Sequence, residues 1–170
     1  MMGRTWIKYL RKLTLLLTLW ISTSTYGQIY KYLKLEDGLS SRNVYAVQQA
    51  NGGFMWFLTD NGIDRYDGTE ITRYSLTIDG VKFTEYSSCR FIYDHANDNL
   101  WLATNGGKLL RYTQRNNNFK VMYAPNIHYR RSDIMRCAVS PIDIKGNIWM
   151  FVGEQAFRYN IYTNEGCEMA

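Results

Sequence analysis

The sequence contains few residues of the kind that enzymatic catalysis requires. Its 170 residues include two histidines, and neither His95 nor His128 stands in a Ser-His-Asp, Cys-His or His-Glu-x-x-His arrangement, so we expect both in solvated loops. A glycine-rich phosphate-binding loop is also missing. Asp60, Asp64 and Asp67 lack the glycine and the bidentate glutamate that complete a calcium loop. We therefore expect no catalytic residue, no metal ion and no cofactor.

Cysteine is scarce, with Cys89, Cys137 and Cys167 as the three copies. An odd number of cysteines at no metal-ligand spacing argues against a disulfide framework, although one bridge with a spare thiol stays open. Cys89 and Cys137 each fall near the start of a predicted strand. We expect both to act there as small buried hydrophobic residues.

Long apolar runs are missing after residue 27, so we expect no membrane span there. Residues 1–27 have a basic start, a nine-residue apolar stretch from Leu13 to Ile21, and small residues at Thr25 and Gly27. The basic residues are Arg4, Lys8, Arg11 and Lys12. This pattern predicts a secretory signal peptide over residues 1–27 and an exported protein, periplasmic or secreted. A membrane anchor is the alternative, but it needs about 20 apolar residues.

An excess of positive charge is also missing once the leader is set aside. The full sequence has a net charge of +5, and four of its 20 Lys and Arg residues lie in the leader. The remainder has 16 basic and 15 acidic residues, a net charge of +1. Nucleic acid is therefore not expected as a partner.

What the sequence does contain is a repeat marked by tryptophan. Trp56, Trp101 and Trp149 are 45 and 48 residues apart, and an Arg-Tyr pair follows each after 9 to 11 residues. This period is the length of a four-stranded propeller blade. A helical repeat has a similar length, but the tryptophans sit in short runs of β-forming residues between Gly, Asn and Asp turns. The sequence therefore predicts an all-β fold, a partial β-propeller of about three four-stranded antiparallel blades over residues 28–170.

The predicted strands follow from these turn signals. A lone alternating strand spans residues 29–35, and in closed propellers such a strand commonly completes the last blade. Blade one (40–76) has strands at 43–49, 54–59, 63–66 and 71–76; blade two (87–123) has strands at 89–93, 100–104, 108–113 and 119–123. Blade three, expected to be incomplete (132–170), has strands at 134–139, 148–152 and 156–159, with a fourth beginning at Ile161.

The second strand of each blade is apolar throughout rather than alternating. A strand pressed between two neighbouring blades buries both of its faces, which explains the continuous run. We therefore expect the repeated aromatic residues to form the core between blades. These residues are Trp56, Trp101, Trp149, Tyr66, Tyr112 and Tyr159.

The segment Asp37-Gly38-Leu39-Ser40-Ser41-x-Asn43-Val44, followed by Gly53-x-x-Trp56-x-x-Thr59-x-Asn61-Gly62-Ile63-x-Arg65-Tyr66-Asp67, resembles the two-component regulator propeller repeat. That repeat is found in the periplasmic sensor region of bacterial hybrid two-component systems. Blade two keeps Trp101, Thr104, Asn105, Gly106, Arg111 and Tyr112, whereas blade three keeps Trp149, Gly153, Arg158 and Tyr159. The family usually has glycine where this chain has Leu58, Ala103 and Phe151. We therefore do not expect the strands of this chain to pack at that position as they do in the family.

The resemblance implies a sensor that binds polysaccharide breakdown products and switches on the genes that process them. Histidine kinase activity would reside in downstream modules that are not in this sequence. A secreted propeller enzyme, a carbohydrate-binding module and a protein-interaction module are the alternatives. The best binding cluster by residue type is His128, Tyr129, Arg130 and Arg131, where Arg forks and aromatic faces suit a sugar acid; a plain solvated loop is the alternative.

About three blades would leave the two end faces of the ring uncovered, with apolar surface in water. We therefore expect missing blades or further copies of the chain as partners, beside an oligosaccharide ligand. Our hypothesis is that the sequence is a fragment of a longer sensor. Self-assembly into a closed ring is the alternative.

Overall fold

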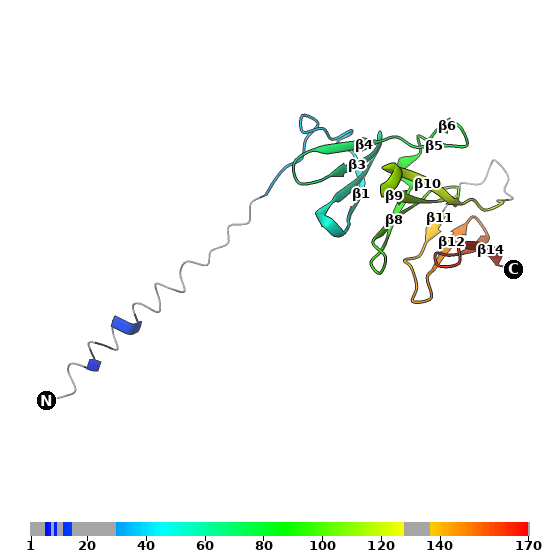
Figure 1. Ribbon diagram of the computed structural model, residues 1–170. Helices are drawn as coiled ribbons and strands as arrows, with labels where there is room; N and C mark the ends of the chain where they lie inside the picture. Colours follow the sequence, from blue (N-terminus) through cyan, green and yellow to red (C-terminus); the bar gives the residue numbers. More distant parts are fainter. Residues whose placement is uncertain (1–5, 8, 10–11, 15–29, 128–136, 170) are drawn as a thin grey trace. The chain divides into compact units, whose positions relative to one another are not determined.

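The computed structural model describes residues 6, 7, 9, 12–14, 30–127 and 137–169. The chain divides into two units, residues 1–32 and 33–170. In the first unit, the described residues up to 14 are helical, and residues 30–32 have no regular secondary structure. No helix in this described part of the chain is long and apolar enough to cross a membrane. The second unit consists of strands, turns and short 3-10 helices (Figure 1).

Three antiparallel sheets of four strands follow one another along the second unit. Blade one contains β1 (Val44–Gln49), β2 (Met55–Thr59), β3 (Gly62–Tyr66) and β4 (Ile71–Tyr74); blade two contains β7 (Arg90–Asp94), β8 (Asn99–Ala103), β9 (Leu109–Thr113) and β10 (Asn118–Tyr123). Blade three contains β11 (Cys137–Val139), β12 (Asn147–Val152), β13 (Gln155–Asn160) and β14 (Glu165–Met169). In each blade, every strand pairs with the next strand along the chain. This arrangement confirms the predicted all-β fold of about three four-stranded blades.

Shorter elements connect these strands. A hairpin of β5 (Thr77–Ile78) and β6 (Val81–Lys82) stands between blades one and two in the sequence. The 3-10 turns are η1 (Asn51–Gly53), η2 (Tyr86–Ser88) and η3 (Gln114–Asn116).

Blade three differs from the prediction at its fourth strand. Ile161 does not begin a strand, because residues 161–164 form a turn in which Asn164 has φ 57°. The fourth strand is β14, which pairs with β13 from Ala156–Met169 to Asn160–Glu165. The expectation of an incomplete blade three is therefore wrong. Its last strand, Glu-Gly-Cys-Glu-Met, has no alternation of apolar and polar residues. It lies at the edge of the sheet and is mostly exposed, so apolar residues are not needed there.

The predicted lone strand at residues 29–35 is not observed over its described part. Residues 30–34 have no regular secondary structure, and Leu35–Gly38 form a turn. Ile29 lies outside the described residues. An alternating sequence becomes a strand only where a neighbouring strand offers a hydrogen-bonding edge. None of the described strands pairs with residues 30–35.

Two hairpin turns are capped by aspartates whose acidity is shifted. Asp67 Oδ1 accepts hydrogen bonds from the backbone N–H groups of Glu70 and Thr69, both at 2.8 Å. These bonds, that of Glu70 first, lower the pKa of Asp67 from 3.8 to about 2. Asp143 Oδ1 accepts from the Asn147 backbone N–H at 2.8 Å, and this bond is the main cause that lowers the pKa of Asp143 to about 2.

These turns predict a loss of stability in acid. Both carboxylates have a folded pKa below the unfolded value of 3.8, so their stabilising effect is complete above about pH 4 and is lost as the pH falls towards 2. Urea unfolding midpoints should fall across this range. The double variant Asp67→Asn/Asp143→Asn should show a smaller fall than the unmodified chain. Equal falls in the two proteins would show that these carboxylates do not contribute.

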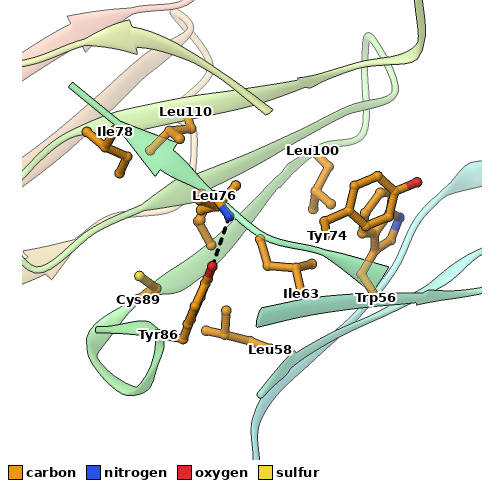
Figure 2. Packing of buried hydrophobic residues seen from close by; sticks show 11 residues of the cluster. Trp56, Leu58, Ile63, Tyr74, Leu76, Ile78, Tyr86, Cys89, Leu100 and Leu110 are labelled. Atoms are coloured by element: carbon orange, nitrogen blue, oxygen red, sulfur yellow. Dashed lines mark hydrogen bonds between the residues drawn. The ribbon is translucent and has the colours of Figure 1, made fainter. Parts of the chain in front are cut away.

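Two apolar clusters lie between successive blades. The first joins blades one and two and includes Trp56, Leu58 and Ile63 from blade one, with Leu100 and Leu110 from blade two. Figure 2 shows these residues with Leu76, Ile78, Tyr86 and Cys89 from the connecting segment, where the Leu76 N–H donates to Tyr86 Oη at 2.9 Å. The second cluster joins blades two and three and includes Trp101, Ala103, Ile148, Met150 and Phe157.

The contact between blades one and two is built on the repeated Trp, Arg and Tyr. Trp56 is 2% exposed, and its ring lies edge-on to Tyr112 with centroids 4.7 Å apart. The Arg65 guanidinium lies 5.7 Å from the Trp56 ring and donates to Tyr112 Oη at 2.9 Å. Tyr112 Oη in turn donates to Asn117 Oδ1 at 2.6 Å. We call Trp and Arg of one blade, with Tyr and Asn of the next, the inter-blade cluster.

The same inter-blade cluster recurs between blades two and three. Trp101 is 1% exposed, lies 5.7 Å from Tyr159 in an edge-on arrangement, and stacks with Arg111 at 5.6 Å. Tyr159 Oη donates to Asn164 Oδ1 at 3.1 Å. Asn117 and Asn164 both have positive φ, which asparagine tolerates better than most residues. The repeat in the sequence therefore corresponds to a repeated contact between successive blades.

The outer face of blade three presents half of another inter-blade cluster. Trp149 pairs in register with Arg158, as Trp56 does with Arg65 and Trp101 with Arg111. Trp149 is half-buried rather than buried as predicted, because no described blade covers it. The neighbouring repeat position shows the same difference, since Leu58 and Ala103 are 0% and 2% exposed whereas Phe151 is 51% exposed. Blades one and two each bury the corresponding face against the next blade.

Candidate functional site

A groove of about 580 Å³ runs along the first strands of the blades. Among described strands of different blades, β1 and β7 approach each other most extensively, so the blades converge at their first strands. The groove is lined by Gln48 of β1, by residues 90–93 of β7, by His95, and by residues 137–142. In a propeller the strands at the convergence line the central channel. The groove therefore lies at the position that a channel wall has in a complete propeller.

The polar groups of the groove are cationic or neutral. The Arg90 guanidinium is held by the backbone, with Nη1 donating to the Cys89 carbonyl at 2.7 Å. His95 is exposed and lies edge-on to Tyr93, with ring centroids 4.6 Å apart. Tyr93 Oη donates to Asp98 outside the groove. No described residue lining the groove is Asp or Glu, so the site suits a ligand with hydroxyl or carboxylate oxygens.

Two cysteines lie at the start of the first strands of blades two and three. Cys89 is fully buried and Cys137 is partly buried, and neither forms a disulfide. Burial raises the pKa of the Cys89 thiol to about 12 and also raises the pKa of Cys137. Because the thiolate is the nucleophilic form, these shifts disfavour reaction of either thiol at neutral pH.

Loop Gly38–Asn43, which carries the family-like motif, is held on blade one by a buried carboxylate. Asp64 Oδ2 accepts hydrogen bonds from the Ser40 N–H at 2.7 Å and the Ser40 hydroxyl at 2.8 Å. The Ser40 and Thr59 hydroxyls are 2.8 Å apart and share a hydrogen bond. Arg73 Nε donates to the Gly38 carbonyl at 2.7 Å. These contacts fix the loop that carries the motif to the sheet of blade one, so the motif has a structural role here.

The structure tests only part of the predicted site. His128, Tyr129, Arg130 and Arg131 lie outside the described residues. His95 is an exposed loop residue as expected, and it lies beside the groove that the sequence did not reveal. No group of three or more His, Cys, Asp or Glu residues that could hold a metal ion occurs in the described part of the chain.

No protein-family model matches the sequence, and no curated protein is similar to it. Among solved structures, two of the extracellular domain of BT4673 from B. thetaiotaomicron are similar to this chain. One is described as part of a one-component system and has a TM-score of 0.61 at 20% identity. The other is described as part of a hybrid two-component system and has a TM-score of 0.58 at 17% identity. Those matches cover 88% and 82% of this chain and 20% and 18% of the other chain.

Two further structures extend the comparison. The extracellular domain of the hybrid two-component system BT3049 from the same organism has a TM-score of 0.58 at 21% identity, over 82% of this chain and 20% of that one. An H270A virginiamycin B lyase from Staphylococcus aureus, solved with quinupristin, has a TM-score of 0.58 at 18% identity, over 85% of this chain and 46% of that one. The chain thus spans about a fifth of the sensor domains it matches. Its described fold is a partial β-propeller of the kind found in extracellular domains of two-component systems.

Proposed function

We propose that this chain is part of the ligand-binding input region of an extracytoplasmic sensor that belongs to a hybrid two-component system. The observation that carries the proposal is the first-strand groove, which combines a backbone-held Arg90 with the aromatic residues Phe91 and Tyr93 and has no acidic residue among its described lining. The likeness in fold to extracellular domains of such systems supports it. Export by the leader at residues 1–27 belongs to the same proposal.

The proposed ligand is an acidic oligosaccharide released from a polysaccharide. A sugar acid offers a carboxylate for the Arg90 fork and ring faces for the aromatic side chains. The segment His128, Tyr129, Arg130 and Arg131 adds residue types suited to the same ligand. Binding would then regulate transcription through kinase and DNA-binding modules elsewhere in the sensor.

The proposal also requires that further blades complete the propeller. The support is the outer face of blade three, which carries Trp149, Arg158 and Phe151. In blades one and two, the corresponding residues lie against the next blade. The occupant of this face is another blade that brings the Tyr and Asn of an inter-blade cluster.

Arg90→Ala should weaken binding of an acidic oligosaccharide by about tenfold or more, because it removes the charge-assisted contact. Isothermal titration with an oligogalacturonate, on this chain and on the complete sensor, measures the effect. Arg115→Ala is the matched control, since Arg115 lies outside the groove. Arg130→Ala/Arg131→Ala in the complete sensor is a second arm. Unchanged affinity in both arms would remove the acidic-ligand assignment.

A secreted propeller enzyme is the second candidate, favoured by the fold likeness to the lyase. His95 is the histidine that the structure places beside the groove. In the described residues it contacts the Tyr93 ring and makes no hydrogen bond to a carboxylate or a nucleophile. The observed geometry therefore supports binding better than catalysis.

A further inference from the structure

The contact between blades one and two contains a second cavity, of about 350 Å³. It lies beside the inter-blade cluster of Trp56, Arg65, Tyr112 and Asn117, and Phe54 and Leu100 complete its apolar wall. No residue lines both this cavity and the first-strand groove. The two sites can therefore be altered independently.

The repeat differs between the two contacts at one residue that lines the cavity. Gln114 follows Tyr112 by two positions, and Ile161 follows Tyr159 by the same two positions in blade three. Ile161 is buried in the apolar cluster between blades two and three. Gln114 is exposed and lines the cavity between blades one and two. At the first contact a polar, exposed residue thus stands where the second contact buries an apolar one.

A cation lines the cavity, and no carboxylate of the described residues forms an ion pair with it. The Arg65 guanidinium lies 4.8 Å from the Phe54 ring centroid, and Nη1 donates to Tyr112 Oη at 2.9 Å and lies 3.4 Å from Asn117 Oδ1. Its Nε is buried and has no hydrogen-bond acceptor among the described residues, and no described carboxylate forms an ion pair with Arg65. Because Nε is buried, a ligand in the cavity would meet the rest of the guanidinium, whose charged N–H donors suit a carboxylate, the strongest acceptor available.

The remaining lining sets the kind of molecule that carries this carboxylate. Trp56 and Tyr112 offer ring faces and edges, while Asp98 and Gln114 place hydrogen-bonding groups around the cavity. Apolar walls with a few polar groups are typical of small-molecule sites. We propose that this cavity binds a hexuronic acid unit, with its carboxylate at Arg65, its ring against the aromatic wall, and its hydroxyls at Asp98 and Gln114. This inference goes beyond the proposed function, because it assigns a separate site between two blades.

Gln114→Ile provides a test that leaves Arg65 and the inter-blade cluster in place. The substitution puts the residue of the second contact into the first, so it should fill the cavity without lowering the melting temperature. Titration of the purified chain with sodium glucuronate, followed by NMR of the arginine side chains, should show binding at Arg65. Binding should weaken about tenfold or more in Gln114→Ile, and glucose should bind about tenfold or more weakly than glucuronate.

Matched controls separate this site from the groove. Arg115→Ile changes the same turn outside the cavity and should keep glucuronate binding. The glucuronate-dependent change in the Arg65 side-chain signals is the readout, so binding of the same sugar acid at Arg90 in the groove is scored separately. Equal binding of glucose and glucuronate at Arg65, or unchanged binding at Arg65 in Gln114→Ile, would each overturn the proposal.

Discussion

Trp101→Ala is expected to lower the free energy of unfolding by about 3–5 kcal/mol, whereas Trp149→Ala should lower it by about 1 kcal/mol. Both tryptophans occupy the same position of the repeat and pair in register with an arginine. Trp101 is covered by Tyr159 and the rest of blade three, so its removal leaves a cavity. Trp149 has no described blade over it and is only half-buried, so its removal takes less surface out of the core.

Urea unfolding followed by circular dichroism measures both changes on the same chain. Trp101→Phe is a milder companion variant, which keeps an aromatic ring at the site if the alanine variant does not fold. Equal losses for Trp101→Ala and Trp149→Ala would contradict the assignment of Trp149 to an uncovered face. A large loss at Trp149 would mean that another blade or another copy already covers that face in solution.

Asp64→Ala should lower the free energy of unfolding by about 3 kcal/mol, because it leaves the N–H and hydroxyl of Ser40 without their acceptor. Asp64 is fully buried, and its Oδ1 has no hydrogen-bond partner among the described residues. Asp79→Ala is the matched control. Its carboxylate pairs with Lys108 at the surface, so the loss should stay under about 1 kcal/mol.

The repeat supplies a rescue for this position. Leu110 and Phe157 immediately precede the repeated arginines of blades two and three, as Asp64 precedes Arg65 in blade one. The double variant Asp64→Leu/Ser40→Ala removes the Ser40 hydroxyl together with its acceptor and leaves only the Ser40 N–H unpaired, so it should recover part of the loss seen with Asp64→Leu alone. A double variant as unstable as the sum of the two single variants would show that Ser40 and Asp64 are not coupled.

The blade pattern could be predicted because its turns carry their own signals. Asn61-Gly62 and Asp67-Gly68 predict hairpins, and the adjacent strands β2, β3 and β4 begin within a residue of the predicted positions. Gly62 has φ 145°, and a Cβ there would lie 2.5 Å from the Tyr74 carbonyl oxygen, so glycine is required. The hairpin of β5 and β6 was missed although Asp79-Gly80 is the same kind of signal, because its strands are only two residues long.

The contacts between blades were only partly visible in the sequence. The Trp and Arg-Tyr spacing indicates a repeated core, but it does not show that Arg65 donates to the tyrosine of the following blade. The asparagines that complete the inter-blade clusters each follow the tyrosine by five positions, at 117 and 164, and this shared spacing was the available signal. Lone segments are harder, since residues 30–35 alternate like a strand but have no described pairing edge.

The candidate sites could not be predicted, because each combines residues from different blades. Gln48, Arg90 and Pro141 are about 40 to 50 residues apart in sequence and meet only where the first strands converge. The cavity beside Arg65 is lined by the polar Gln114, and this residue becomes notable only once Ile161 is seen buried at the corresponding place. Sequence spacing alone does not reveal such a difference.

The central claim is that successive sheets pack through the same inter-blade cluster, as blades of a propeller do. Nuclear Overhauser effects on the side chains of the purified chain test it most directly. The account predicts contacts between the Trp56 indole and the Tyr112 ring, and between the Trp101 indole and the Tyr159 ring, whose centroids lie 4.7 and 5.7 Å apart. Detecting neither contact, with the two indoles near unrelated side chains, would contradict it.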